Sequence, residues 1–315
     1  MKSIPQSKRG RYHAGVKLPQ RIRITEVGPR DGLQNEGCIL TVPQKIALID
    51  ALTRAGLPEI EVTSFVNPRR VPQLGDAEDV LAGITRHPDT IYSALVPNMP
   101  GMERASRCEI DKIAVFTAAS ESFNRHNIGA TIAESIARFQ PVVKAAREEN
   151  RSIRGYISCV VSCPYEGPIA PAQVRDIASM LLDLGVDEID LGETIGMAVP
   201  GDIERLYAGL SDLLAPEQTI LHLHDTRGTA LACAMRAMEL GVWRFDTSCA
   251  GLGGCPFAPG AMGNLATEDL VYLCDREGCE TGVNSPILFE AGRQMTAALG
   301  RDLPGRAFTA DGAAS

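Results

Sequence analysis

Short apolar segments alternate with longer amphipathic segments along the whole chain, and this alternation constrains the fold more than any other feature. The strand candidates are rich in β-branched and apolar residues, and they span 22–27, 59–63, 91–95, 112–116, 155–161, 188–191, 219–223 and 244–248. The helix candidates span 43–55, 77–84, 101–107, 132–149, 171–184, 202–214 and 229–240, with an eighth starting at Thr267. Eight such units predict an α/β fold of the closed (β/α)8 TIM-barrel type. A doubly wound open sheet is the alternative, but no GxGxxG motif follows the first strand.

Charge, hydropathy and cysteine usage exclude several classes of protein. The chain has 31 Lys and Arg residues against 39 Asp and Glu residues, and this net charge of −8 is unsuited to coating nucleic acid. No apolar run approaches the roughly 18 residues that a membrane span requires. Nine cysteines lie scattered without a CxxC pair, which predicts buried thiols rather than a disulfide framework or a structural zinc site. We therefore expect a globular protein with neither nucleic-acid nor membrane partners.

The two ends of the chain differ in composition from its body. Lys and Arg residues recur over the first 23 residues without any acidic residue. This bias resembles an organelle transit peptide, but Pro and Gly residues interrupt its helix. We expect a basic extension over 1–20, a barrel domain with additional C-terminal helices over 21–304, and a loose tail over 305–315. The cytoplasm is the expected compartment, and the mitochondrial matrix is the alternative.

Charged residues at the ends of the first two strands indicate a site at the barrel mouth. Arg30 and Asp31 follow the first strand, and Glu61 lies at the end of the apolar second strand. A carboxylate in an apolar strand is costly to bury without a partner, so we predict that Arg30 pairs with Glu61. On the loop alone, a solvated Arg30–Asp31 ion pair is the favoured interpretation.

The motif His222-Leu-His224 favours a metal site. Residues i and i+2 of a strand point to the same face, so the two imidazoles project together while Leu223 faces the helices. In a barrel, Asp31 comes to the same mouth. A carboxylate, two imidazoles and an amide oxygen suit Mg²⁺ or Mn²⁺, with Zn²⁺ or Co²⁺ as alternatives. Two core histidines without a metal are the competing interpretation.

A glycine-rich segment surrounds one cysteine. Four glycines lie around or close to Cys255, and the segment continues through Gly260 to Asn264. Such a loop can approach a ligand closely or close over it. The alternative is a flexible turn with an incidental thiol.

These motifs together resemble those of the 3-hydroxy-3-methylglutaryl-CoA lyases, a family of barrel metallolyases with an Arg-Asp loop. The matching segments are VGPRDGLQNE at 27–36, EVTSFV at 61–66, SCPYEG at 162–167, HLHDT at 222–226, GLGGCP at 251–256 and GNLATEDLV at 263–271. They occur in the family's order, and the resemblance extends from about residue 22 to 300.

The resemblance implies roles for individual residues. It implies that Asp31, His222, His224 and Asn264 bind the divalent metal. It further implies that Arg30 is the catalytic arginine, that Cys255 is the catalytic loop cysteine, that Glu61 supports Arg30, and that Gln34 lies beside the metal. The implied substrate is an acyl-CoA, and the implied assembly is a homodimer.

The implied reaction is a retro-Claisen cleavage of 3-hydroxy-3-methylglutaryl-CoA to acetyl-CoA and acetoacetate. The metal would lower the pKa of the substrate hydroxyl. Arg30 would stabilise the thioester oxyanion, and Cys255 is a candidate proton donor to the carbanion. His222 is a ligand, a base or both.

Several positions depart from the family pattern. Glu193 stands where the family usually has Asp, Arg70 where it has Trp, Arg227 where it has Tyr, and Gly37 where it has Lys. We expect the longer Glu193 to extend its carboxylate further into the pocket and include it among the catalytic candidates. These changes leave open a related acyl group, such as that of citramalyl-CoA. A condensing synthase and a non-catalytic CoA-ester or metal-binding protein are the other hypotheses.

Overall fold

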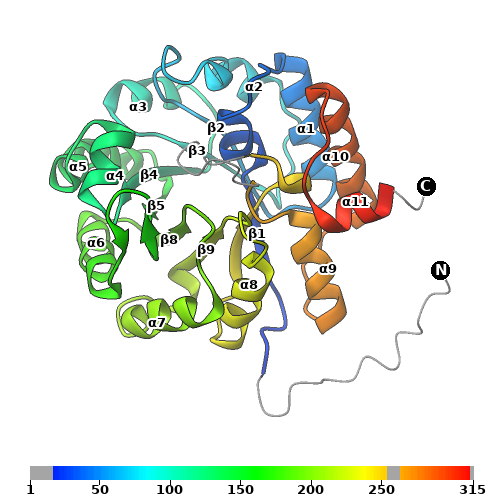
Figure 1. Ribbon diagram of the computed structural model, residues 1–315. Coiled ribbons are helices and arrows are strands. Elements are labelled where there is room, and N and C mark those ends of the chain that lie inside the picture. Colours follow the sequence, from blue (N-terminus) through cyan, green and yellow to red (C-terminus); the bar gives the residue numbers. More distant parts are fainter. Residues whose placement is uncertain (1–16, 254–262, 313–315) are drawn as a thin grey trace.

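A closed barrel of eight parallel strands forms the centre of the computed structural model, which describes residues 17–253 and 263–312 (Figure 1). The barrel strands are β1 (Arg23–Glu26), β2 (Glu59–Ser64), β3 (Ile91–Leu95), β4 (Lys112–Ala118), β5 (Ser152–Ser158), β8 (Glu188–Glu193), β9 (Thr219–Leu223) and β10 (Arg244–Thr247). Each strand pairs with its neighbours in sequence order, and β10 closes the barrel onto β1. The predicted (β/α)8 barrel is therefore confirmed, and the open sheet is excluded.

Helices surround the barrel on all sides (Figure 1). The surrounding helices are α1 (Val42–Arg54), α2 (Ala77–Gly83), α3 (Met99–Ala105), α5 (Ile132–Glu148), α6 (Pro171–Leu184), α7 (Pro200–Leu210), α8 (Ala230–Glu239) and α9 (Thr267–Glu277). Local sequence fixes where they begin: at α5, the Glu134 amide donates to the Thr131 hydroxyl and the Thr131 amide donates back to the Glu134 carboxylate. Helix α10 (Ser285–Leu299) packs outside the barrel against α1, as expected for the C-terminal helices.

Apolar and charged residues occupy opposite faces of the strands. Outward-facing residues such as Leu191, Leu223 and Phe245 pack against the helices and form the main hydrophobic core. The inward faces instead hold buried ionic residues, among them Arg154, which is 1% exposed. The main hydrophobic core therefore lies between barrel and helices, and the barrel interior holds a polar network beside a small apolar cluster of Leu95, Ala114 and Tyr156.

Strand β5 lies three residues earlier than the sequence indicated. The prediction was 155–161, whereas Ser152 pairs with Lys112 and the strand ends at Ser158. Cys159 then turns into the left-handed region, with φ 61°, which breaks the extended backbone. The shift places Arg154 inside the strand, where it points into the barrel.

A helix after β4 and a pair of short strands after β5 were not predicted. Helix α4 (Glu121–Ile128) follows β4, and the short strands β6 (Ser162–Cys163) and β7 (Gly167–Pro168) form an antiparallel pair after β5. The two elements contact each other, because the Ser122 amide donates to the Glu166 carboxylate over 2.7 Å and the rings of His126 and Tyr165 stack at 4.3 Å.

The prediction of a loose tail over 305–315 is wrong for residues 306–312, which form helix α11 (Arg306–Gly312). The Asp269 carboxylate accepts the amides of Arg306 and Ala307 at the start of this helix, and Phe308 stacks on Phe289 at 6.2 Å. Residues 1–16, most of the predicted basic extension, lie outside the described residues. No helix within the described ranges is long and apolar enough to cross a membrane.

Candidate active site

A tight π-helical turn at the end of β1 presents Arg30 and Asp31 at the barrel mouth. The Val27 carbonyl accepts the amides of Arg30, Asp31 and Gly32 at 3.1, 2.8 and 3.2 Å. The buried Glu26 carboxylate accepts the Gly28 amide at 2.9 Å and so fixes the start of the turn. Such turns are uncommon and often occur at functional sites.

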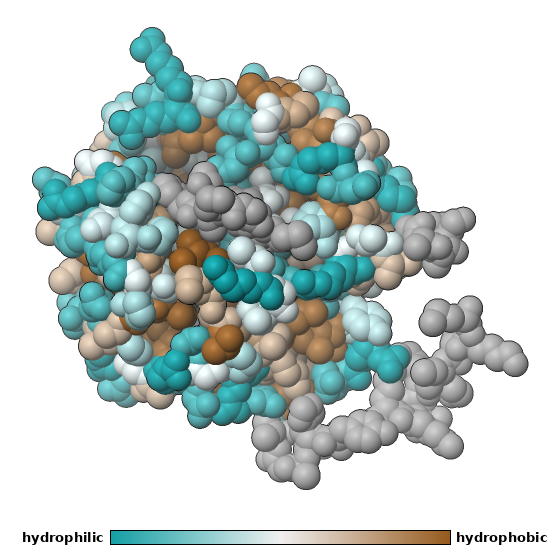
Figure 2. Space-filling model, in the orientation of Figure 1, coloured by the Kyte–Doolittle hydropathy of each residue, from teal (hydrophilic) through white to brown (hydrophobic). Residues whose placement is uncertain are grey.

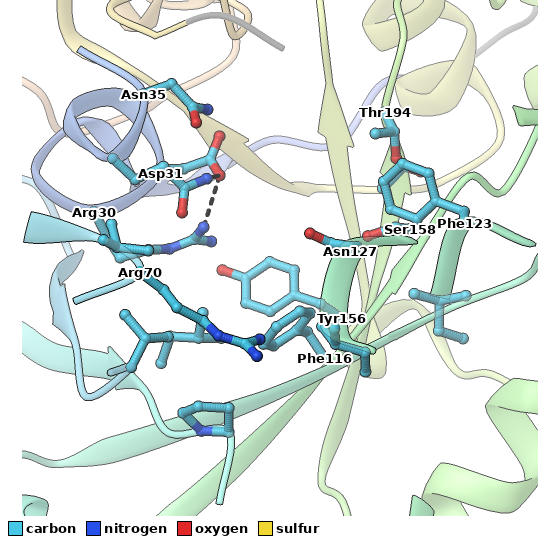
Figure 3. A pocket seen from close by; sticks show the side chains of 18 of the residues that line it. Arg30, Asp31, Asn35, Arg70, Phe116, Phe123, Asn127, Tyr156, Ser158 and Thr194 are labelled. Carbon is cyan, nitrogen blue, oxygen red and sulfur yellow. Dashed lines mark hydrogen bonds and ion pairs between the residues drawn. The ribbon is translucent and has the colours of Figure 1, made fainter. Parts of the chain in front are cut away.

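Arg30 forms the ion pair that the sequence predicted. Its Nε donates to Glu61 Oε2 over 2.5 Å, and its Nη1 donates to Asp31 Oδ1 over 2.6 Å (Figure 3). Burial works against the charged guanidinium, but the charges of Glu61 and Asp31 outweigh it and raise the pKa of Arg30. Nη2 has no partner among the described residues, so one donor of a fixed cation remains free for a ligand.

Asp31, His222 and His224 form a potential metal-binding group. One potential ligand atom from each lies within 4.8 Å of the others, and His222 Nε2 is 3.8 Å from Asp31 Oδ2. His222 Nδ1 contacts Asp246 Oδ2 at 3.2 Å, and His224 Nδ1 contacts the Glu193 carbonyl at 2.9 Å. Because each Nδ1 is held by an acceptor, each Nε2 is available as a ligand, the arrangement typical of metal-binding histidines.

The charge states of two members of this group suit metal binding. Burial works against the Asp31 carboxylate, but Arg30 and the two histidines outweigh it and lower its pKa. Burial and the neighbouring His222 lower the pKa of His224 to about 4, so that this imidazole is neutral at pH 7. An ionised carboxylate and a neutral imidazole are the forms that bind a cation.

Asn264 reaches the same point from the segment before α9. This segment runs antiparallel to the end of β9, because the Leu265 amide donates to the Leu223 carbonyl and the Asp225 amide to the Gly263 carbonyl. Asn264 Nδ2 donates to Asp31 Oδ2 over 3.0 Å. Its buried Oδ1 has no hydrogen-bond partner among the described residues. An amide oxygen left unpaired beside a carboxylate and two imidazoles fits a divalent cation.

Gln34 completes the surroundings of Asp31. Its Nε2 donates to Asp31 Oδ1 over 2.7 Å, and the same oxygen accepts from Arg30. Asp31 Oδ1 is therefore held by two donors, while Oδ2 faces His222 and Asn264.

Asp31, His222 and His224 line a cavity of about 700 Å³ at the carboxyl ends of the strands. Arg30 and Asp31 form one side, and Ser158 and Thr194 lie across from them (Figure 3). The surface around the barrel mouth is largely hydrophilic, with smaller groups of hydrophobic residues between (Figure 2). The cavity size is typical of sites for small molecules and cofactors.

Of the divergent residues, Arg70 lines the cavity, but Glu193 and Arg227 do not. Glu193 pairs in register with the outward-facing Leu223, and its carboxylate accepts the Met197 amide over 3.0 Å. Arg227 donates to the carbonyls of Ile195 and Gly196. The expectation that Glu193 extends into the pocket is therefore wrong, because strand alternation turns it outward to stabilise the following loop. Cys255 lies outside the described residues.

Asp246 and Tyr156 also belong to the site, although neither was predicted from the sequence. Asp246 orients His222, and the Tyr156 hydroxyl lies 3.3 Å from Glu61 Oε2 and 3.2 Å from Asp246 Oδ2. Asp246 is an acid within the predicted strand 244–248, and this position was the signal in the sequence that could have found it. Tyr156 already lay within the predicted strand 155–161, but no pattern in the sequence marked its hydroxyl as part of the site.

Two buried carboxyls hold the turn that precedes the glycine-rich segment. Glu268 accepts the Ala250 amide at 2.7 Å, and Glu26 accepts the Cys249 amide at 2.8 Å. Burial raises the pKa of Glu26 to about 7 and that of Glu268 to about 8, and the neighbouring charge of Glu26 further disfavours ionisation of Glu268. Both groups therefore bind a proton more tightly in the folded state than in the unfolded chain.

Glu268→Gln should flatten the pH dependence of stability. Because folding raises the pKa of Glu268 above its unfolded value of 4.5 to about 8, wild-type stability should fall as the pH rises through this window. At pH 8 the variant should be more stable by on the order of 3 kcal/mol, and at pH 5 the two should be similar. Urea unfolding of chelator-treated protein at both pH values measures this. Parallel profiles for the two proteins would contradict it.

Comparison with known proteins identifies the family. The HMGL-like family model matches residues 21–294. The human mitochondrial hydroxymethylglutaryl-CoA lyase is 48% identical over 90% of this chain and 87% of its own length. A 3-hydroxy-3-isohexenylglutaryl-CoA/hydroxymethylglutaryl-CoA lyase from Pseudomonas aeruginosa is 45% identical over 94% of this chain and 98% of its own.

A solved structure agrees with these relatives. An HMG-CoA lyase from Acinetobacter baumannii, in complex with coenzyme A and 3-methylmalate, is 39% identical with a TM-score of 0.89. The match covers 92% of this chain and 95% of that one. This chain, with its barrel and its Arg-Asp turn, belongs to the HMGL-like family.

Proposed function

We propose that this chain is a metal-dependent carbon–carbon lyase that cleaves 3-hydroxy-3-methylglutaryl-CoA to acetyl-CoA and acetoacetate. The observation that carries the proposal is the convergence of Asp31, His222, His224 and the unpaired Asn264 oxygen beside the guanidinium of Arg30. Relatives at 45% and 48% identity with this activity in their names support it.

A divalent cation, Mg²⁺ or Mn²⁺, fits the four donors. When bound, it would supply a Lewis acid that lowers the pKa of the substrate hydroxyl. Because Asp246 holds Nδ1 of His222, only its Nε2 is available, so His222 is either a ligand of the cation or the acceptor of the hydroxyl proton, and not both at once. Gln34 fixes the orientation of Asp31.

Arg30 is the residue that stabilises the enolate. Breaking the bond between C2 and C3 moves an electron pair onto the thioester oxygen, and a fixed cation with a free N–H lowers the energy of that charge. Glu61 holds Nε and so keeps the guanidinium from turning away. Protonation of the carbanion carbon is assigned to Cys255, as the family resemblance implies.

A coupled assay with Mg²⁺ or Mn²⁺ tests the proposal. 3-Hydroxy-3-methylglutaryl-CoA should yield acetyl-CoA and acetoacetate in equal amounts, and EDTA should abolish the reaction until metal is restored. Citramalyl-CoA, run in parallel, should be the poorer substrate. Binding of the thioester without turnover, or net condensation from acetyl-CoA, would contradict the proposed activity.

The assembly and compartment are also proposals. We infer a homodimer, which sedimentation at micromolar concentration tests. The proposed compartment is the cytoplasm. The human relative is named as mitochondrial, so the mitochondrial matrix is the alternative. A fluorescent fusion in the native host distinguishes the two compartments.

A further inference from the structure

The C-terminal helix α11 joins two segments of the barrel mouth that lie far apart in the sequence. The helix, drawn in red in Figure 1, packs beside α9 and α10. Arg306 Nη1 donates to Asp225 Oδ2, and Asp225 directly follows His224. The Asp269 carboxylate, in the first turn of the helix that follows Asn264, accepts the Arg306 amide over 3.2 Å. The start of α11 is therefore attached to the segment after each of two potential metal ligands.

Asp225 connects these contacts to the potential metal-binding group. Its amide donates to the Gly263 carbonyl over 3.1 Å, so its backbone supports the residue before Asn264. Its Oδ1 accepts the amide at the start of α8 over 2.9 Å, while its Oδ2 accepts from Arg306. The Asp225 side chain is only 12% exposed, so water competes little for these contacts. A displacement of Asp225 would therefore move His224 and the segment of Asn264 relative to each other.

The packing of α11 leaves it little freedom to shift. The Gly305 amide donates to the Ala250 carbonyl over 2.9 Å, and a Cβ added at Gly305 would lie 3.0 Å from the carbonyl carbon and oxygen of Ala250. On α10, a Cβ added at Gly292 would lie 2.6 Å from the ring of Phe308. A side chain at either glycine would push α11 away from its neighbours. The sequence therefore specifies this position of the helix.

We propose that Arg306 is a positioning residue for the potential metal-binding group. Through its two aspartate partners, it keeps the segments that carry His224 and Asn264 at the separation that a shared cation requires. Ligand atoms must lie within about 0.2 Å of their ideal distances, so a small shift between the segments weakens binding. Arg306 is not among the described residues that line the cavity, so it acts on the cation only through other residues. The inference rests on the proposed metal-dependent function and extends it to the C-terminal helix.

Arg306→Met should raise the Mn²⁺ dissociation constant about tenfold, the lower end of the effect of removing support for a metal ligand. Titration of the full chain, followed by the electron paramagnetic resonance of free Mn²⁺, measures this constant. Arg306→Lys retains the charge and should recover most of the affinity. A helix that only covers the outer face of α10 would contribute to stability and leave the Mn²⁺ affinity unchanged.

Arg293→Met is the matched control. Arg293 donates to Asp311 of the same helix over 3.4 Å, and its side chain is about half exposed, as is that of Arg306. Arg293 also donates to Glu290, which lies on α10 and not at the barrel mouth. This variant should lower the urea midpoint about as much as Arg306→Met does, because each removes an ion pair of a half-exposed arginine. Its Mn²⁺ affinity should equal that of wild type.

Hydrogen exchange in metal-free protein gives a second measurement that needs neither cation nor substrate. The Leu265 amide donates to the Leu223 carbonyl, and the Asp225 amide donates to the Gly263 carbonyl. Both amides should exchange faster in Arg306→Met, because the segments that they join are held less firmly. In Arg293→Met they should exchange at the wild-type rate.

Two outcomes overturn the proposal. One is unchanged Mn²⁺ affinity in Arg306→Met, and the other is an equal loss of affinity in Arg293→Met. Wild type that binds Mn²⁺ without cleaving the thioester would contradict the lyase function and leave the result for Arg306 intact. Wild type that binds no Mn²⁺ would contradict the proposed metal dependence, and equal exchange rates in the two variants would then overturn the role of Arg306.

Discussion

Arg30→Met is expected to lower kcat by about 10²- to 10³-fold, the usual effect of removing one donor that stabilises an oxyanion. The structure gives Arg30 a free Nη2 while Nε and Nη1 are held by Glu61 and Asp31, so the guanidinium is oriented before substrate arrives. Methionine retains most of the side-chain volume but supplies neither charge nor donor. The measurement is steady-state release of acetyl-CoA at saturating metal.

Metal binding separates this effect from a general loss of structure. Gln34 and Asn264 still hold Asp31 in the variant, so the Mn²⁺ dissociation constant should change far less than kcat. Arg30→Lys is the second variant: it retains the charge but cannot donate to both carboxylates from one plane, and it should recover only part of the rate. If Arg30→Met turns over within tenfold of wild type, Arg30 does not stabilise the enolate.

Most of the potential metal-binding group could be predicted because barrel topology brings strand ends together. Asp31 follows β1, whereas His222 and His224 lie at the end of β9. Asp31 and His222 are 191 residues apart in the sequence, yet a parallel barrel places the ends of both strands at one mouth. The pairing of Arg30 with Glu61 was predictable for a different reason, since a buried carboxylate needs a partner.

The features that escaped prediction depend on long-range contacts. The register of β5 is set by pairing with β4, which no local pattern of β5 contains. Helix α11 forms because Asp269, far from it in sequence, caps its first amides. The direction of Glu193 follows from its register with Leu223 on β9, and the family resemblance placed it wrongly because a motif position does not state which face it occupies.

Arg154→Met is expected to destabilise the protein by about 3–5 kcal/mol, the effect of leaving buried charges without a partner. Arg154 donates to Glu59, Glu188 and Asp246 at 2.9, 2.9 and 3.0 Å from within the barrel. Lys112 still donates to Glu59 and Glu188 in the variant, so Asp246 is the carboxylate that loses most of its neutralising charge. Urea unfolding measures the change in the free energy of unfolding.

Arg175→Met is the matched control. Arg175 also pairs with a carboxylate, Asp212, but both side chains are exposed, at 37% and 71%. Solvent screens such a pair, so its loss should destabilise the protein far less than the loss of Arg154. Similar losses for the two variants would mean that the buried network contributes no more than a surface ion pair.

The milder variant Arg154→Lys tests whether the buried ion pairs of Arg154 support the potential metal-binding group. Lysine retains the charge but cannot donate to Glu59, Glu188 and Asp246 together, so Asp246 should be held less firmly. Asp246 in turn orients His222 through Nδ1, and loss of such support typically weakens metal binding 10- to 100-fold. We therefore expect Arg154→Lys to fold and to bind Mn²⁺ at least about tenfold more weakly. Unchanged Mn²⁺ affinity in a folded variant would show that Asp246 holds His222 without help from Arg154, and the barrel interior would then serve stability alone.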